Sequence, residues 1–291
     1  MDESNIRTNY RDDSFLREAF FEFAPCVFPG ISFKDWFEMG FWNERYIPYS
    51  FLEGSKIVSN VSIFLMDIVL KGEPRKAIQF ATVGTLPGHR KAGLSRILME
   101  RVIEDYQSQV DFMFLFANDS VLDFYPKFGF KRQGECAFTH RVENIEKKRG
   151  ARLLDLSNPD DFRILVDLSE QTKPVTERFG SAKNGPIFMW HALYMQSNNL
   201  WYIEKEKIVI VCECHDKTLS IFDALSESDF SMKSIIGYLV TEEIENVEVY
   251  FTPDKLDLNF ESKNGDLDSP LFVRGIDLSG LKFKFPALAQ T

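Results

Sequence analysis

The spacing of apolar residues near the start of the chain is typical of amphipathic helices. Within residues 12–23, one helix face is apolar and is formed by Phe15, Leu16, Ala19, Phe20 and Phe23. Such recurrence every three or four residues predicts a helix, which Pro25 brings to an end. A second, shorter helix is expected over residues 33–39, with Gly40 as its stop signal.

Beyond residue 48 the pattern changes to that of β-strands. Three apolar runs, separated by turns that contain glycine or proline, predict successive antiparallel strands over residues 49–52, 56–70 and 77–86. Helical spacing returns next, and the remaining elements expected in this half are a helix at 94–106, a strand at 110–117, a short helix at 121–125 and a strand at 135–142. The predicted order is therefore α-α-β-β-β-α-β-α-β.

A charged segment, residues 143–150, divides the chain of 291 residues into halves of similar length. Because this length exceeds the usual size of one compact domain, we expect two domains, at residues 1–145 and 151–291. The second half is expected to contain helices from Ser157 to 168, at 187–195 and at 226–239, and strands at 152–156, 200–203, 208–214, 219–224 and 247–251. This order echoes the first half and is compatible with a structural duplication, although no motif repeats.

The composition, 44% hydrophobic and 27% charged, is that of an ordinary soluble globular protein. The net charge of −10, from 34 Lys and Arg against 44 Asp and Glu, argues against sequence-independent binding of nucleic acid, which requires a basic surface. Most of the acidic excess follows residue 148. Two interpretations are open: acidic walls that attract a cationic amine, or a solvated surface.

Neither metal binding nor membrane insertion is indicated by the sequence. The four cysteines include Cys212 and Cys214, whose spacing is not that of a tetrahedral zinc site, so we expect thiols in a reducing compartment. The N-terminus is acidic and lacks an apolar stretch, while the most apolar window, 61–70, is too short to span a bilayer and contains Asp67. We therefore expect a cytoplasmic protein with no metal and no membrane partner.

The clearest chemical signal lies at the junction over residues 83–96, where an apolar strand runs into a basic turn that opens a helix. The first N–H groups of a helix have no acceptor within it, and together with the helix dipole they favour a phosphate or pyrophosphate. Gly93 permits close approach of the backbone, and Ser95 is small. Positive charge is supplied by Arg90, Lys91 and Arg96.

Two common phosphate-binding motifs do not fit this turn. The P-loop requires G-x-x-x-x-G-K-[ST], but Leu94 stands where the lysine would be. The Rossmann fingerprint requires three glycines after the first strand of a parallel unit, whereas this strand follows antiparallel hairpins.

The sequence resembles the Gcn5-related N-acetyltransferase (GNAT) family in two motifs. Residues 90–95 match the R/Q-x-x-G-x-G/A turn that binds the pyrophosphate of coenzyme A, except that Ser95 replaces the final Gly or Ala. Residues 118–130 resemble the family segment that ends in Y-x-K-x-G-F, here Tyr125 to Phe130. The predicted order of helices and strands also resembles that of the family. The resemblance covers roughly residues 1–142.

This resemblance implies an α/β (α+β) architecture, the GNAT fold, with a mixed, mostly antiparallel sheet flanked by helices. The second half would be a degenerate GNAT-like α/β domain. Because it lacks a pyrophosphate turn, it should not bind coenzyme A, and it would line the acceptor pocket or form a homodimer surface. The tandem layout resembles, more loosely, the first two domains of the enhanced intracellular survival proteins.

The resemblance further implies an N-acetyltransferase that carries an acetyl group from acetyl-CoA to a primary amine, either a small molecule or a peptide, by direct attack in a ternary complex. The pantetheine arm would bond to the backbone of Val83 and Thr85, with Asn118 beside it. Tyr125 would be the general acid, since the pKa of a phenol, about 10, is close to that of a thiol; packing among phenylalanines is its alternative role. The turn would supply the other cofactor contacts, from Arg90, Lys91, Ala92, Gly93, Leu94, Ser95 and Arg96.

The sequence does not identify a general base. Some family members carry a glutamate where this chain has Ala77, and Gln79 follows on the same strand face. Water, Glu53, Asp67 or a carboxylate of the second half remain alternatives. The missing carboxylate also leaves a second function open, that of a non-catalytic acyl-CoA-binding sensor or assembly module.

Overall fold

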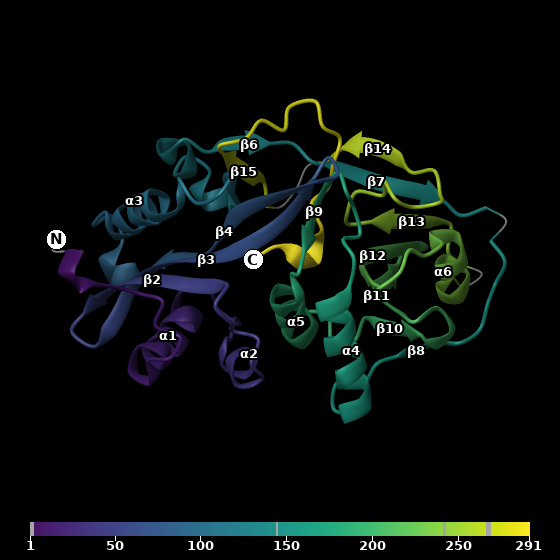
Figure 1. Cartoon of the computed structure of the whole chain (residues 1–291), viewed down its shortest axis with the longest axis horizontal. Coiled ribbons are helices and arrows are strands. Elements are labelled where there is room, and N and C mark those ends of the chain that lie inside the picture. The colour runs from purple at the N-terminus through teal and green to yellow at the C-terminus, as the bar shows by residue number, and fades with distance from the viewer. Residues whose placement is uncertain (1–2, 144, 241–242, 266–268) are drawn as a thin grey trace.

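The strand-forming segments assemble into two sheets that lie side by side, each with helices on both faces (Figure 1). The structure is a computed structural model, and it describes residues 3–143, 145–240, 243–265 and 269–291. Within these ranges, no helix is both long and apolar enough to cross a membrane. We call each sheet with its helices a lobe.

The first lobe is built on a sheet of mostly antiparallel strands. Along the sheet the strands are β1 (Ile6–Thr8), β2 (Tyr46–Glu53), β3 (Lys56–Leu70), β4 (Glu73–Thr85), β5 (Phe112–Phe116), β15 (Leu271–Arg274) and β6 (Lys131–Gln133), and β9 (Phe179–Ala182) pairs with the far end of β3. The hairpin of β3 and β4 forms the centre. Only β4 and β5 run parallel to each other among these described strands.

Successive side chains along the strands of the first lobe point to opposite faces of the sheet, and the apolar ones form one core on each face. Ile78 and Phe80 face α3 (Leu94–Tyr106), which contributes Leu98 and Met99. Ala77 and Ala81 face the opposite way, toward α1 (Ser14–Val27) and α2 (Lys34–Glu38), as expected for successive side chains of a strand. Figure 1 shows α3 on one side of this sheet and α1 and α2 on the other.

The second lobe has its own sheet and helices. The strands are β14 (Glu261–Asn264), β7 (Cys136–Arg141), β13 (Asn246–Val249), β12 (Thr218–Leu225), β11 (Ile208–His215), β10 (Leu200–Ile203) and β8 (Ala151–Leu153). The helix α6 (Met232–Leu239) covers one face, while α4 (Pro159–Gln171) and α5 (Gly185–Tyr194) cover the other. Short 3-10 helices occur at Glu3–Asn5, Pro87–His89, Asp119–Val121, Tyr125–Phe128, Glu204–Glu206 and Ala287–Ala289.

The two lobes exchange strands, so the expected domain limits at residues 145 and 151 do not separate the sheets. β7 precedes residue 145 but pairs with β13 and β14, because its apolar residues Cys136 and Phe138 are buried in the core of the second lobe. In return, β9 and β15 of the second half complete the first sheet. The prediction that the strand at 135–142 belongs to the first lobe was therefore wrong, and β1, β6, β9, β14 and β15 were not predicted.

Three expected helices also differ from the structure. The first, α1, does not end at Pro25 as predicted but continues to Val27 with Pro25 inside it. The segment at 121–125 forms no α-helix but belongs to a pair of 3-10 turns, since Pro126 lacks an N–H donor and Gly129, at φ 81°, ends the second turn. The helix expected from residue 226 begins only at Met232. Ser231 is its cap and accepts a hydrogen bond from the Ser234 N–H at 3.0 Å, whereas Ser226 bonds within the preceding loop.

The lobes repeat one topology. In the first lobe β2, β3 and β4 are antiparallel neighbours, and β5 then pairs parallel to β4 after a crossover through α3. In the second lobe β10, β11 and β12 are likewise antiparallel, and β13 pairs parallel to β12 after α6. The expected mixed α/β fold with mostly antiparallel sheets flanked by helices is therefore confirmed.

The contact between β9 and the first sheet depends on a glycine. A Cβ atom at Gly180 would lie 2.4 Å from the backbone oxygen of Thr176, which cannot yield as a side chain could. We expect Gly180→Ala to lower the free energy of unfolding by about 1–3 kcal/mol through overpacking, measured by urea denaturation. Gly134→Ala is the matched control, because nothing lies within 4 Å of its added methyl group. Equal stability of the two variants would contradict this account of β9.

Candidate active site

The parallel pair β4 and β5 separates halfway along its length. Its register ends at Gln79 and Phe114, although β4 continues to Thr85 and β5 to Phe116. An irregularity in the β3–β4 register between Asn60 and Ser62 lies where the separation begins, and bulges of this kind bend a strand and increase its twist. Beyond Gln79, β4 therefore has a neighbouring strand along one edge only.

Val83 and Thr85 present their backbone groups to this gap. The Leu86 N–H donates to the Val58 oxygen of β3 at 2.9 Å, and alternate residues of a strand direct their N–H and C=O groups to opposite edges. The backbone N–H and C=O groups of Thr85 and of Val83, two residues earlier, therefore point away from β3. This orientation is the one that the resemblance requires for pairing with an extended ligand.

The turn between β4 and α3 exposes a row of backbone donors. Lys91, at φ 65°, and Gly93, at φ 81°, are both in the left-handed region, and Gly93 caps α3 without a side-chain hydrogen bond. Within the described chain, the N–H groups of residues 91–96 have no acceptor, and the first bond of the helix is donated by Ile97 to the Gly93 oxygen. Such a row at a helix N-terminus attracts anions.

Ser95, the position that departs from the family motif, turns its hydroxyl toward the sheet. Its Oγ lies 2.7 Å from the Thr85 Oγ1 and 3.3 Å from the Ser59 Oγ, and Ser59 and Thr85 are also bonded at 2.7 Å. This hydroxyl cluster fastens the first turn of α3 to β3 and β4. Serine at this position therefore leaves the outer surface of the turn open.

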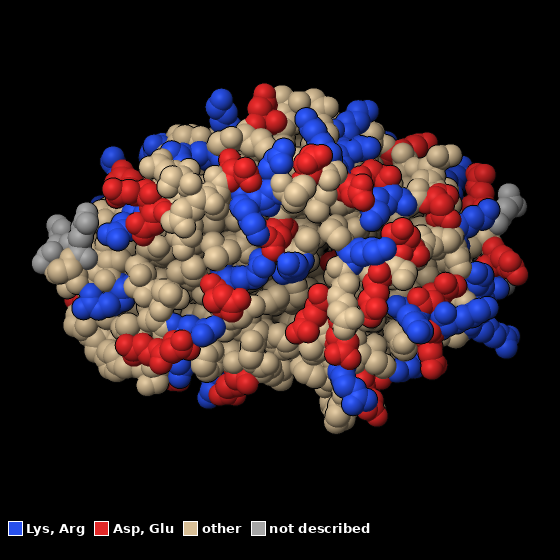
Figure 2. Space-filling view, viewed as in Figure 1, with Lys and Arg blue, Asp and Glu red and all other residues tan. Residues whose placement is uncertain are grey.

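The basic side chains of the turn have different environments. Arg90 donates from Nε to the Thr85 oxygen at 3.3 Å, so its guanidinium lies against the end of β4. Arg96 donates to Glu100 at 2.8 Å, an interaction that raises the pKa of this exposed arginine. Lys91 has no partner among the residues described. Figure 2 shows basic and acidic groups intermixed over one face of both lobes.

Tyr125 lies on the α3 side of the sheet, in an aromatic cluster. Its ring centroid is 5.3 Å from that of Phe124, 5.9 Å from Phe272 and 6.4 Å from Phe130, and only 5% of the residue is exposed. Burial raises its pKa to about 12. The phenol is thus protonated at neutral pH. No described residue hydrogen-bonds its oxygen, and because this oxygen is not among the enclosed polar atoms that lack a partner, it reaches solvent.

Asn118 follows β5 at the far side of the gap. Its Oδ1 accepts hydrogen bonds from the N and Oγ of Ser120, both at 3.2 Å, and so caps the 3-10 helix Asp119–Val121. This local role orients the side chain at the end of β5. The Nδ2 group carries no bond to any residue that the structure describes.

The two carboxylates considered as general bases, Asp67 and Glu53, each contact another side chain. Burial alone would raise the pKa of Asp67, but its bonds to Lys76 and Arg45 lower it below the usual value. Glu53 lies 3.0 Å from the Nε2 atom of His89, at the exposed turn between β2 and β3. Both carboxylates are thus paired with other side chains.

Gln79, where the strands part, binds the C-terminal segment on the face opposite α3. Its Nε2 donates to the Ala289 oxygen at 2.9 Å, and its Oε1 accepts from the Thr291 N–H at 2.8 Å. Thr291 also donates from Oγ1 to the Phe80 oxygen at 3.1 Å. No local pattern signals these contacts, because they join residues more than 200 positions apart.

A cavity of about 210 Å³ opens on this same face, beside Ala81 and Thr82 of β4. It is lined by Phe28, Ile31, Phe33, Trp36, Tyr46, Phe64, Ala81, Thr82, Ile187, Trp190, Gln290 and Thr291. Both halves of the sequence contribute, since α5 and the C-terminal segment close the side facing the second lobe. In Figure 1 the end of the chain lies between the two sheets.

In the second lobe the corresponding gap is filled by the chain itself. β12 and β13 part after Ile221 and Val249, and the C-terminal segment enters there, with the Ala287 N–H bonded to the Tyr250 oxygen at 3.0 Å. The Thr252 hydroxyl also donates to the Lys284 oxygen at 2.9 Å. An extended ligand could not take this place without displacing the segment.

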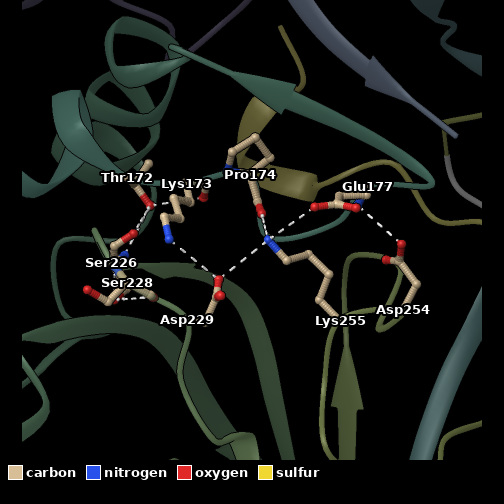
Figure 3. Close-up of polar contacts among 9 residues, drawn as sticks. All are labelled: Thr172, Lys173, Pro174, Glu177, Ser226, Ser228, Asp229, Asp254 and Lys255. Carbon is tan, nitrogen blue, oxygen red and sulfur yellow. Dashed lines mark hydrogen bonds and ion pairs between the residues drawn. The ribbon is translucent and has the colours of Figure 1, made fainter. Parts of the chain in front are cut away.

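The junction before α6 differs from the turn before α3 in charge. A cavity of about 350 Å³ there contains Lys173 and Lys255, but both face carboxylates (Figure 3). Asp229 lies 3.7 Å from Lys173 and 3.8 Å from Lys255, and Glu177 lies 3.7 Å from Lys255. The two lysines of this junction are therefore paired with carboxylates.

Comparison with known proteins places this arrangement in a family. Residues 31–132 match the family model of the acetyltransferase (GNAT) domain, a range that includes the gap and the turn. The chain therefore contains a GNAT domain, as its two motifs predicted. No curated protein sequence matches the chain.

Solved structures share the fold over nearly the whole chain. A conserved Enterococcus faecalis protein, described as a probable N-acyltransferase, has a TM-score of 0.60 at 14% identity and covers 92% of this chain and 72% of its own. Eis1 from Mycobacterium abscessus has a TM-score of 0.57 at 13% identity, covering 92% and 73%. A GCN5-related N-acetyltransferase from Kribbella flavida has a TM-score of 0.55 at 14% identity, covering 94% and 72%. The likeness extends to the tandem arrangement of the lobes.

The anchoring of the C-terminal segment by Gln79 can be tested directly. We expect Gln79→Ala to destabilise the fold by about 1–3 kcal/mol, because the Ala289 oxygen and Thr291 N–H lose their partner in a buried place. Amide hydrogen exchange of residues 287–291 should become faster while that of α6 is unchanged. Gln107→Ala, at the solvent-exposed end of α3, is the control. Unchanged exchange at residues 287–291 would contradict this role of Gln79.

Proposed function

We propose that this chain is an acetyl-CoA-dependent N-acetyltransferase that acts on a primary amine by direct attack in a ternary complex. The observation that carries the proposal is the row of unpaired N–H groups at residues 91–96, which lies at the end of the one-sided segment of β4. A backbone donor row beside an unpaired strand edge suits a ligand that has both an anionic pyrophosphate and an extended amide-bearing arm.

The residues of the turn fit coenzyme A in shape and charge. A Cβ at Gly93 would meet nothing within 4 Å, so the space in front of the turn is open. Arg90 and Lys91 add positive charge there, and Val83 and Thr85 offer backbone bonds to the pantetheine arm. The remaining contacts would come from the backbone of Ala92, Leu94, Ser95 and Arg96, with Asn118 across the gap.

The reaction requires one proton donor, and Tyr125 suits this role. When bound, acetyl-CoA supplies the acetyl group as a thioester; the C–N bond forms, the C–S bond breaks, and the leaving thiolate takes a proton. Tyr125 holds a proton at neutral pH because burial raises its pKa to about 12. Packing accounts for its ring, while its hydroxyl oxygen is not among the enclosed polar atoms and can donate to a bound ligand.

The amine loses a proton in the same reaction, and water is the simplest acceptor. Gln79 is not a base, and both of its amide groups are bonded to the C-terminal segment. The alternative function, a non-catalytic acyl-CoA-binding sensor or assembly module, rests on this absence of a carboxylate. Thiol release with any amine would exclude it, whereas acyl-CoA binding without thiol release would favour it.

Binding of acetyl-CoA tests the donor site. We expect the double variant with Arg90→Ala and Gly93→Asp to bind at least about tenfold more weakly, a loss of about 1.4 kcal/mol, because a carboxylate replaces open space before the donor row. Isothermal titration calorimetry measures this change. The double variant Arg132→Ala with Gly134→Asp makes the same charge change away from the turn and should bind normally. Equal affinity of all three proteins would remove the basis of the proposal.

The role of Tyr125 is tested by removing its hydroxyl. We expect Tyr125→Phe to lower kcat about 100-fold or more, with acetyl-CoA affinity unchanged, because the phenol acts only in proton transfer. Thiol release under saturating substrates provides the measurement, and Tyr202→Phe in the second lobe is the control. Because the pKa is raised, the wild-type protein should not lose kcat through this group between about pH 7 and pH 10. Wild-type turnover in Tyr125→Phe would assign the tyrosine to packing.

A further inference from the structure

The cavity of about 210 Å³ has aromatic and aliphatic walls. Phe33 and Trp36 come from the first lobe and Trp190 from α5, and the ring centroids of Phe33 lie 6.1 Å from Trp36 and 6.4 Å from Trp190. No Asp, Glu, Lys or Arg side chain lines it among the residues described. The acidic excess of the sequence is therefore not concentrated here.

The polar side chains of the cavity are few and uncharged. The Tyr46 hydroxyl lies 2.8 Å from the Thr82 Oγ1, and burial of Tyr46 raises its pKa so far that it remains neutral. Thr82 has φ 48°, an unusual value for a β-branched residue, and the Asn60 side chain donates to its oxygen at 2.8 Å. This constrained backbone holds the hydroxyl pair at the cavity wall, where it can hydrogen-bond one small polar group.

The size and location of the cavity limit what it can hold. A cavity of about 150 Å³ accommodates benzene, so about 210 Å³ accommodates one ring with a short side chain. The cavity lies on the face of β4 opposite α3, just beyond the point at which β4 and β5 part. An acceptor in this place would approach the gap from the side that the donor turn does not occupy.

These observations point to the acceptor, and the inference rests on the proposed transferase function. We propose that the acceptor is a monoamine with one aromatic or branched aliphatic group, and that this group occupies the aromatic cavity formed jointly by the two lobes. Additional ammonium groups of a polyamine or an amino sugar would be buried against apolar walls without a carboxylate, which is unfavourable. Apolar surroundings also favour the neutral form of the amine, which is the nucleophile.

Direct binding distinguishes this proposal from the alternatives. Trp36 and Trp190 line the cavity, so ligand binding to the full chain can be followed by tryptophan fluorescence. We expect 2-phenylethylamine to bind at least about tenfold more tightly than spermidine. Ala81→Leu and Ile31→Phe, which fill the cavity from two different walls, should each weaken 2-phenylethylamine about tenfold or more. Ala137→Leu, on β7 away from the cavity, should have no effect.

The outcomes separate the acceptor proposal from the proposed function. Equally tight binding of spermidine, or unchanged binding of 2-phenylethylamine in both filled variants, would overturn the acceptor class even if thiol release occurs. Selective binding of 2-phenylethylamine without thiol release from acetyl-CoA with any amine would instead overturn the transferase function, and the acceptor role with it. A third outcome concerns the acyl chain of the donor. If octanoyl-CoA bound more tightly than acetyl-CoA to the wild-type protein but not to Ala81→Leu, the cavity would be assigned to an acyl chain, and this result would also overturn the proposal.

Discussion

The early end of the parallel pairing between β4 and β5 is the constraint on which the architecture of the site depends. Beyond Gln79 and Phe114, one edge of β4 has no neighbouring strand, so its backbone donors and acceptors must be satisfied in another way. Part of the requirement is met by Thr291, whose hydroxyl donates to the Phe80 oxygen. The groups of Val83 and Thr85 remain beside the donor row of the α3 turn, and this combination is the basis for proposing that the gap binds an extended anionic ligand.

The second lobe shows what happens when the same topology is completed by the chain itself. Its parallel pair also parts, after Ile221 and Val249, but residues 284–287 bond to the loop that follows β13. The donor turn is replaced by a loop in which two lysines, Lys173 and Lys255, face the carboxylates of Asp229 and Glu177. A single C-terminal segment therefore closes the gap of the second lobe and lines the cavity of the first. Through this segment the second lobe would shape the acceptor side of the proposed site.

The sequence predicts those parts of the structure that depend on local patterns. Helical spacing located α1 and α3, and the turn was identified because Gly93 and the basic residues are contiguous. The strand β15 was missed because residues 271–274 form a short apolar run whose partners, β5 and β6, lie more than 130 positions earlier. For the same reason, no pattern around Gln79 indicated Thr291. The sequence around Ser226 predicted the N-cap of α6. In the structure the Ser226 N–H instead donates to the Thr172 hydroxyl within a loop, and Ser231 is the cap of α6.

The residues Ala77 and Gln79, which place no carboxylate on this part of β4, can be connected with the apolar character of the cavity. A protein base is most useful when the amine binds as an ammonium ion, which a carboxylate near the amine would stabilise. Aromatic walls would act in the opposite direction, because they favour the neutral amine and would leave deprotonation of the ammonium ion to bulk water before binding. In the proposed reaction two protons then move at the site: the one that the amine nitrogen loses as the amide forms, and the one delivered to the leaving thiolate. Tyr125, whose pKa is raised by burial, keeps the second of these protons over a wide range of pH.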